Sequence, residues 1–188
     1  MTSLAPALLL SMPQLLDPNF ARTVVLLCRH SEDGAFGLVL NRPAIAAGRL
    51  TIGGSPGAAF DGELPVWVGG PVEPERSWVL VGPDCPRSGQ ADDEEHVLRI
   101  AEGLDLSASP DLLVAMFQSV PLPHTRLVIG YSGWSAGQLE GELEESSWLL
   151  TDVDPRFIFE TRPEDLWEAA IRRLGVDPGA LQMGRGVH

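Results

Sequence analysis

Short apolar runs separated by turn-forming residues dominate the first half of the chain. Residues 7–11, 23–28 and 35–40 are apolar and rich in Leu and Val, which is typical of buried strands. The pair Asp33-Gly34 between the second and third runs favours a tight hairpin turn. We therefore predict a strand at residues 7–11 and an antiparallel hairpin over residues 23–41.

The middle of the chain has a weaker pattern. Residues 44–62 are rich in Ala, Gly and Pro without a clear period, so we expect a loop with marginal structure there. Residues 66–68 and 77–81 predict two buried strands on either side of the turn at residues 69–71. The polar stretch 83–95 ends in consecutive carboxylates. Because neighbouring side chains cannot all converge on one cation, we predict a solvated loop.

Residues 110–118 and 162–174 have the spacing of helices that bury one face. Thr161 and Glu164 suit a capping box for the second helix, which Gly175 should end. Strands and helices alternate irregularly, so we predict an α+β domain over residues 1–175 and a frayed tail at residues 176–188. The first helix should begin after the N-cap Ser109, and the second should bury Trp167, Ala170, Ile171 and Leu174.

Charge narrows the range of functions. The chain carries 26 acidic and 13 basic residues, a formal net charge of −13, and every basic residue is arginine. Without lysine the protein can form no Schiff base, phosphate-loop lysine contact or Ser–Lys dyad. Nucleic acid is a poor partner, because binding it needs a basic patch and these arginines are scattered.

The two cysteines, Cys28 and Cys85, cannot build a structural zinc site alone, and no histidine cluster adds ligands. We expect one buried and one loop thiol in a reducing compartment, with no metal and no cofactor. The apolar N-terminal stretch lacks a preceding positive charge and is too short to span a bilayer. These features predict a cytoplasmic protein without membrane contact.

The segment 127–140 reads as a buried strand, a glycine-rich turn and the start of a helix. Its Gly133-x-Ser135-x-Gly137 pattern fits the nucleophile elbow of serine hydrolases, with Ser135 as nucleophile. Such enzymes place the histidine base after the serine, and only the terminal His188 follows Ser135. Chain ends fray, so this histidine is a poor base.

The same residues also fit a structural role. Ser135 can serve as the N-cap of a helix with Gln138 at the third helical position, which is a capping box. Leu139 and Leu143 would then face the core, and Trp134 would pack on the sheet. We favour this cap over the nucleophile, and therefore a protein without catalysis, with a serine hydrolase as the alternative.

Several motifs occur in order over nearly the whole chain. They are Met12-Pro13, Asn41-Arg42-Pro43, Gly69-Gly70-Pro71, Gly130-Tyr131-Ser132-Gly133-Trp134 and Trp148-Leu149. Together they resemble the signature of the YqgE/AlgH family of bacterial proteins. The resemblance implies a compact α+β fold with a branched, mainly antiparallel β-sheet surrounded by helices, and it implies no established activity. The family label suggests a transcriptional regulator as a third hypothesis, which the charge opposes.

The candidate binding site comes from three tight turns predicted at strand ends. They are Asn41-Arg42-Pro43, Gly69-Gly70-Pro71 and Gly130-Tyr131-x-Gly133-Trp134. Such turns present backbone N–H groups, and they can converge on a cleft with Arg42, Tyr131 and Trp134 at its rim. The alternative is that all three turns only shape the sheet. We favour a non-catalytic binding or regulatory protein whose partner is an unidentified protein or small molecule. The predicted ligand-binding residues are Asn41, Arg42, Gly69, Gly70, Tyr131, Gly133 and Trp134.

Overall fold

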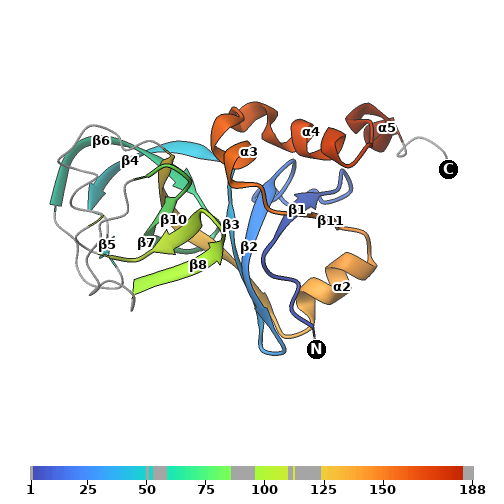
Figure 1. Ribbon diagram of the computed structural model, residues 1–188, viewed down its shortest axis with the longest axis horizontal. Coiled ribbons are helices and arrows are strands. Elements are labelled where there is room, and N and C mark those ends of the chain that lie inside the picture. The colour runs from blue at the N-terminus through green and yellow to red at the C-terminus, as the bar shows by residue number, and fades with distance from the viewer. Residues whose placement is uncertain are drawn as a thin grey trace.

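A computed structural model describes residues 2–49, 51–52, 59–85, 96–109, 112 and 124–183. The helix predicted over residues 110–118, apart from Leu112, and the carboxylates at residues 92–95 lie outside these ranges. The described chain forms a curled, mainly antiparallel sheet with helices beside it, which is an α+β arrangement (Figure 1).

One half of the sheet consists of β1 (Ala7–Ser11), β2 (Val24–Ser31), β3 (Gly34–Val39) and β11 (Trp148–Thr151). β1 pairs antiparallel with both β2 and β11, and β2 turns back through Asp33-Gly34 to pair antiparallel with β3. The strand predicted at residues 7–11 and the hairpin predicted within residues 23–41 are therefore confirmed.

The other half consists of β4 (Pro43–Arg49), β5 (Thr51–Ile52), β6 (Ala59–Val68), β7 (Val72–Val81), β8 (Val97–Ala101) and β9 (Leu104–Ser107). β6 and β7 contain the strands predicted at residues 66–68 and 77–81, which are confirmed. The loop predicted for residues 44–62 is wrong where the structure describes them. β4 pairs antiparallel with β6, and β5 pairs parallel with β7. The residues of β4 that pack against buried valines of β6 and β7 are the small Ala44 and Ala46, so the strand period was hard to see in the sequence.

The long strand β10 (Thr125–Ser135) joins the two halves. Its first part pairs antiparallel with β7 and parallel with β6, and its last part pairs antiparallel with β3. The register shifts between Ile129 and Tyr131, where Gly130 has a φ of 65°. Side chains other than glycine rarely adopt this φ, and a Cβ at Gly130 would lie 2.5 Å from the Gly70 oxygen. The sheet is therefore branched at β10.

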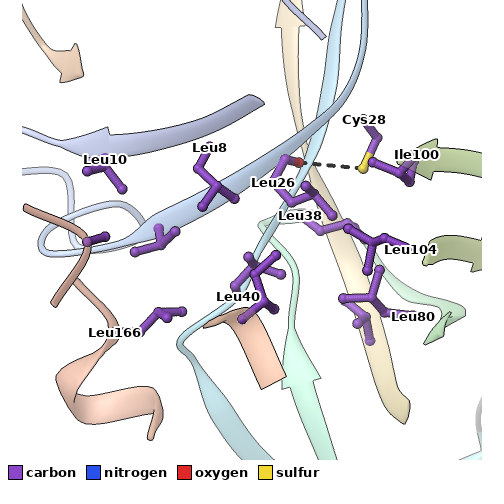
Figure 2. Close-up of a cluster of buried hydrophobic side chains, with 14 of the residues drawn as sticks. Leu8, Leu10, Leu26, Cys28, Leu38, Leu40, Leu80, Ile100, Leu104 and Leu166 are labelled. Carbon is purple, nitrogen blue, oxygen red and sulfur yellow. Dashed lines mark hydrogen bonds between the residues drawn. The ribbon is translucent and has the colours of Figure 1, made fainter. Parts of the chain in front are cut away.

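Alternate residues of the N-terminal strands face two different cores. Leu8 and Leu26 belong to the larger core, whereas Leu9 and Val25 belong to the smaller one. Burial on both faces explains why these strands read as continuous apolar runs and not as alternating patterns. Figure 2 shows the larger core, to which side chains from both halves of the sheet contribute.

The helices are α2 (Gln138–Glu144), α3 (Pro155–Glu160), α4 (Pro163–Arg173) and α5 (Pro178–Met183). In Figure 1, α3, α4 and α5 run together beside β1 and β2, and α2 lies near the end of β11. α3 and α4 pack on the larger core and α2 packs on the smaller one, so the described helices do not clearly surround the whole sheet as the resemblance implied (Figure 1). No helix within the described ranges is long and apolar enough to cross a bilayer.

The ends of α4 differ from the prediction. Its N-cap is Arg162, which makes no side-chain cap bond, so the predicted Thr161–Glu164 capping box is wrong. Thr161 is instead the C-cap of α3, where its backbone N–H donates to Phe157. α5 lies within the segment predicted as a frayed tail, and residues 184–188 lie outside the described ranges.

The buried face of α4 is mostly as predicted. Trp167, Ala170 and Ile171 are buried, but Leu174 is 38% exposed. Leu174 is the C-cap of the helix, so its side chain leaves the stripe, and Leu166 completes the buried face instead. The helix packs this face against the larger core.

Candidate functional site

Ser135 is the exposed last residue of β10. α2 begins one residue after Gly137, which is its N-cap with a φ of 74°, and no side chain caps the helix. The predicted N-cap role of Ser135 is therefore wrong. The side-chain oxygen of Gln138 accepts hydrogen bonds from the Ser135 backbone N–H at 3.0 Å and from its hydroxyl at 3.2 Å. Of the two reciprocal hydrogen bonds of the predicted capping box, only the one from the Ser135 backbone N–H to the Gln138 side chain is formed.

The nucleophile elbow requires an imidazole beside the hydroxyl of Ser135. Among the described histidines, His30 bonds to a carboxylate of α2, and His124 bonds to a backbone carbonyl. His96 is exposed and lines a groove described below. None of these three is hydrogen-bonded to the serine, and His188 lies outside the described ranges. The geometry gives the serine hydrolase alternative no support.

Residues 130–134 lie within β10 and pair with β3 and β7, so the turn predicted there is wrong. The three predicted segments nevertheless meet in space through their backbones. The carbonyl of Arg42 accepts a backbone N–H from β6 at 2.8 Å, and the N–H of Gly69 donates to Ile129 at 2.8 Å. A Cβ at Gly70 would overlap the backbone of Tyr131. The contact of these segments thus joins β4, β6 and β10, and a ligand role for these glycines stays a prediction.

The side chains of Asn41 and Arg42 hold the segment before β2. The Asn41 oxygen accepts from the Val24 N–H at 3.0 Å, and its amide nitrogen donates to the Arg22 carbonyl at 2.9 Å. The guanidinium of Arg42 donates to the carbonyl of Ala21. These bonds satisfy backbone groups at the entrance to β2.

Trp134 lies in the smaller core and is only 6% exposed. Its ring packs near Phe20 and Trp148, and its indole N–H donates to Glu142 at 2.9 Å. The preceding Gly133 is exposed and pairs with β3. The ring of Trp134 is therefore buried in the smaller core, and the prediction that it packs on the sheet is confirmed.

Tyr131 is the one predicted residue that lines an open groove of about 600 Å³. The other walls come from β2, β3, β7 and the β8–β9 hairpin, so both halves of the sheet contribute. Several lining side chains also belong to the larger core. They include Phe36, Trp78, Leu98, Leu106 and Tyr131. The groove is thus a place where the core reaches the surface.

Three aromatic rings form the floor of this groove. The ring centroids of Phe36 and Tyr131 lie 5.2 Å apart, those of Trp78 and Tyr131 5.7 Å, and those of Phe36 and Trp78 5.5 Å. The rings are tilted or edge-to-face, which is the favoured geometry of packed aromatics. Phe36 and Tyr131 are half-buried, so part of each ring remains available to a ligand.

Cationic side chains border the aromatic floor. Arg29 is exposed on β2 opposite Phe36 of β3, and the Arg76 guanidinium stacks 4.8 Å from the Trp78 ring centroid. Arg76 also donates to Glu73 at 3.1 Å. Within the described part of the chain, no Asp or Glu lines the groove, and no cluster of three His, Cys, Asp or Glu could hold a metal ion.

Arg126 shows how a structural arginine differs from these two. Its guanidinium is buried between the rings of Trp67 and Phe159, 4.0 and 5.0 Å from their centroids. It donates to the carbonyls of Leu40 at 3.1 Å and Ile158 at 2.6 Å. Burial lowers the pKa of Arg126 to about 10. This side chain links the sheet to α3 through two backbone carbonyls.

Sequence reasoning missed Arg29, Phe36, Arg76 and Trp78. Each lies in a strand, and local patterns do not show that β3, β10 and β7 are neighbours in this order. One signal was present, because Phe36 is the one aromatic residue of β3 and Trp78 is the one aromatic residue of the strand predicted at residues 77–81. Such rings suit a pocket as well as a core.

Comparison with known proteins identifies the family. The profile of the AlgH-like family matches residues 8–179. A UPF0301 protein from Myxococcus xanthus is 44% identical over 190 residues, and the match covers 100% of both chains. A UPF0301 protein from Ruegeria pomeroyi is 39% identical, and the match covers 95% of this chain and 96% of that protein. The solution structure of AlgH from Pseudomonas aeruginosa is similar with a TM-score of 0.69 and 35% identity, covering 100% of this chain and 96% of that one. The crystal structure of a protein from Corynebacterium diphtheriae shares the fold, with a TM-score of 0.65 and 20% sequence identity. That match covers 97% of this chain and 91% of the other. The chain therefore belongs to the AlgH-like family.

Proposed function

We propose that the protein is a non-catalytic binding or regulatory protein whose small-molecule ligand occupies the groove over Phe36, Trp78 and Tyr131. The observation that carries this proposal is the partly uncovered aromatic floor, which opens from the larger core into a cavity of about 600 Å³. Ligand sites are typically concave, mostly apolar, and of this size. Rings held by strands on two sides are fixed before the ligand arrives, which limits the entropy lost on binding.

The side chains that line the groove also favour binding over catalysis. A catalytic site needs a nucleophile or a general base within hydrogen-bond reach of a reacting atom. Ser135 lies at the far end of β10, where its hydroxyl bonds to Gln138. Apart from His96, the groove offers aromatic, aliphatic and cationic side chains, which recognise a molecule without transforming it. A cytoplasmic location suits a chain whose two cysteines, Cys28 and Cys85, both described in the structure, form no disulfide.

The experiment is a calorimetric titration of the protein with 2-naphthamide and with 2-naphthoate, two bicyclic aromatic probes. Ala108 is half-buried and lines the groove, so Ala108→Phe should fill it and abolish binding of both probes. The matched control is Ala169→Phe, because Ala169 is a half-buried alanine on α4 outside the groove. This control should bind as wild type does.

Two results would contradict the proposal. Wild type might take up neither probe, or Ala108→Phe might bind them as tightly as Ala169→Phe does. Melting curves of both variants show whether each is folded, so that lost binding is not mistaken for lost structure.

A further inference from the structure

We propose that the ligand of this groove is an anion, with a planar group on the aromatic floor and a carboxylate or phosphate held by Arg29 and Arg76. This inference rests on the proposed function and adds the chemical class of the ligand. It starts from a contrast in charge, because the chain has a formal net charge of −13 but the described groove has arginines and no carboxylate among its lining residues.

Most other surface arginines of the described chain are held by carboxylates. The pairs are Arg22–Glu168, Arg156–Asp84, Arg162–Asp165, Arg172–Glu168 and Arg173–Asp154, with distances between 2.6 and 3.0 Å. In a chain with twice as many acidic as basic residues, an arginine without such a partner is the exception. In the groove, Arg29 is of this kind, whereas Arg76 pairs with the exposed Glu73.

Arg29 makes no ion pair within the described ranges, although it projects from a central strand among packed residues. Arg76 pairs only with Glu73, at 3.1 Å on the exposed edge of β7. Its Nε is buried and has no hydrogen-bond partner among the residues that the structure describes. A ligand in the groove cannot reach this buried Nε, and Nη1 bonds to Glu73, so the donors left for a bound anion are those of Arg29 and the Nη2 of Arg76.

The strands place these two cations at the floor of the groove. Arg29 is the register partner of Phe36 across the β2–β3 pair, and directly opposed residues share one face of the sheet. Arg76 precedes Trp78 by two residues on β7, so their side chains also share a face, and the guanidinium stacks on the indole. An anion at these arginines therefore lies beside the rings.

The chemistry favours a planar carboxylate or phosphate ester. A guanidinium binds two oxygens of either group with parallel N–H donors, and these charge-assisted bonds are stronger than neutral ones. The surrounding rings and aliphatic side chains exclude water and strengthen the attraction. The aromatic floor adds stacking for a flat ring system.

The test measures dissociation constants by calorimetry for 2-naphthoate, 2-naphthyl phosphate and the neutral 2-naphthamide. The proteins are wild type, Arg29→Gln, Arg76→Gln and the control Arg22→Gln. Arg22 matches Arg76 closely, because it stacks 4.6 Å from the Trp167 ring and pairs with Glu168, but it lies outside the groove. The two anionic probes distinguish a carboxylate ligand from a phosphate ester.

Either anion should bind wild type at least about tenfold more tightly than the amide, and each groove variant should lose about tenfold for that anion only. Arg22→Gln should bind as wild type does. If the amide binds as tightly as both anions and the groove variants change nothing, the anion proposal is wrong while the binding function stands. If no probe binds wild type, the proposed function fails as well.

Discussion

The carboxylate of Glu142 should be a principal support of the smaller core. Its Oε2 accepts the indole N–H of Trp134 at 2.9 Å and that of Trp148 at 2.8 Å. Its Oε1 accepts a hydrogen bond from the side chain of Gln138 at 2.9 Å. One side chain of α2 thus holds rings from β10 and β11, and Glu142→Ala would leave both indole donors without an acceptor.

The cost follows from the burial of the two rings. Trp134 and Trp148 are 6% and 3% exposed, so water can replace the carboxylate only poorly. A lost hydrogen bond to a charged acceptor costs about 1.5–3 kcal/mol, and two at the lower limit give about 3 kcal/mol for Glu142→Ala. Glu142→Gln keeps one acceptor oxygen and should cost about 1 kcal/mol. At about 2–4 °C per kcal/mol, Glu142→Ala should lower Tm by about 6–12 °C.

The assay is urea unfolding followed by tryptophan fluorescence and by circular dichroism. Coincident transitions with an unchanged m-value make the difference in the free energy of unfolding interpretable. The matched control is Glu144→Ala, an exposed carboxylate in the same helix, which should cost less than about 0.5 kcal/mol. If Glu142→Ala costs no more than this control, the support assigned to Glu142 is wrong.

Three further predictions concern other parts of the molecule. Gly70→Ala should lower the free energy of unfolding, measured in urea, by about 3 kcal/mol or more, because the new Cβ would overlap the β10 backbone at a φ of 154°. Gly141→Ala should raise it by about 0.5–1 kcal/mol, because a Cβ there has no atom within 4 Å. Equal effects of the two substitutions would refute this. The backbone N–H of Glu140, and then His30, lower the pKa of Glu140 below 4.5, so its stabilisation is present at neutral pH and is lost as the pH falls through the lowered pKa. Glu140→Gln should therefore lose less Tm than wild type between about pH 5 and pH 3, and an identical loss would contradict it. Burial raises the pKa of the Cys28 thiol, so Ellman's reagent should react with Cys85 alone in the native protein and with both thiols in urea; equal native rates would rule this out.

The sequence predicted the elements whose structure is determined by residues close together in the chain. The hairpin at residues 23–41 has apolar runs around an Asp-Gly turn, and both features act within a few residues. β4 could not be found in this way, because its alanines and glycine become a strand only through pairing with β6. Ser135 failed as an N-cap because β10 continues to this residue, paired with β3, and leaves Gly137 to start the helix.

The candidate site was predicted only in part. The sequence singled out Tyr131 and three segments predicted as turns. The structure brings these segments together through their backbones, although residues 130–134 belong to β10 and form no turn. The groove depends on Arg29 and Phe36 of the β2–β3 hairpin and on Trp78 of β7. The hairpin and β7 are far apart in sequence and come together because both β3 and β7 pair with β10. That pairing is a property of the whole fold, which no local spacing encodes.

The most direct test of the groove as a binding site uses Tyr131, the only tyrosine of the chain. Incorporation of 3-fluorotyrosine gives a single ¹⁹F resonance on the groove floor. Titration with 2-naphthoate should shift this resonance saturably in wild type and in Ala169→Phe, but not in Ala108→Phe. A resonance that stays in place at a saturating probe concentration, or that moves equally in Ala108→Phe, would contradict the assignment of the groove.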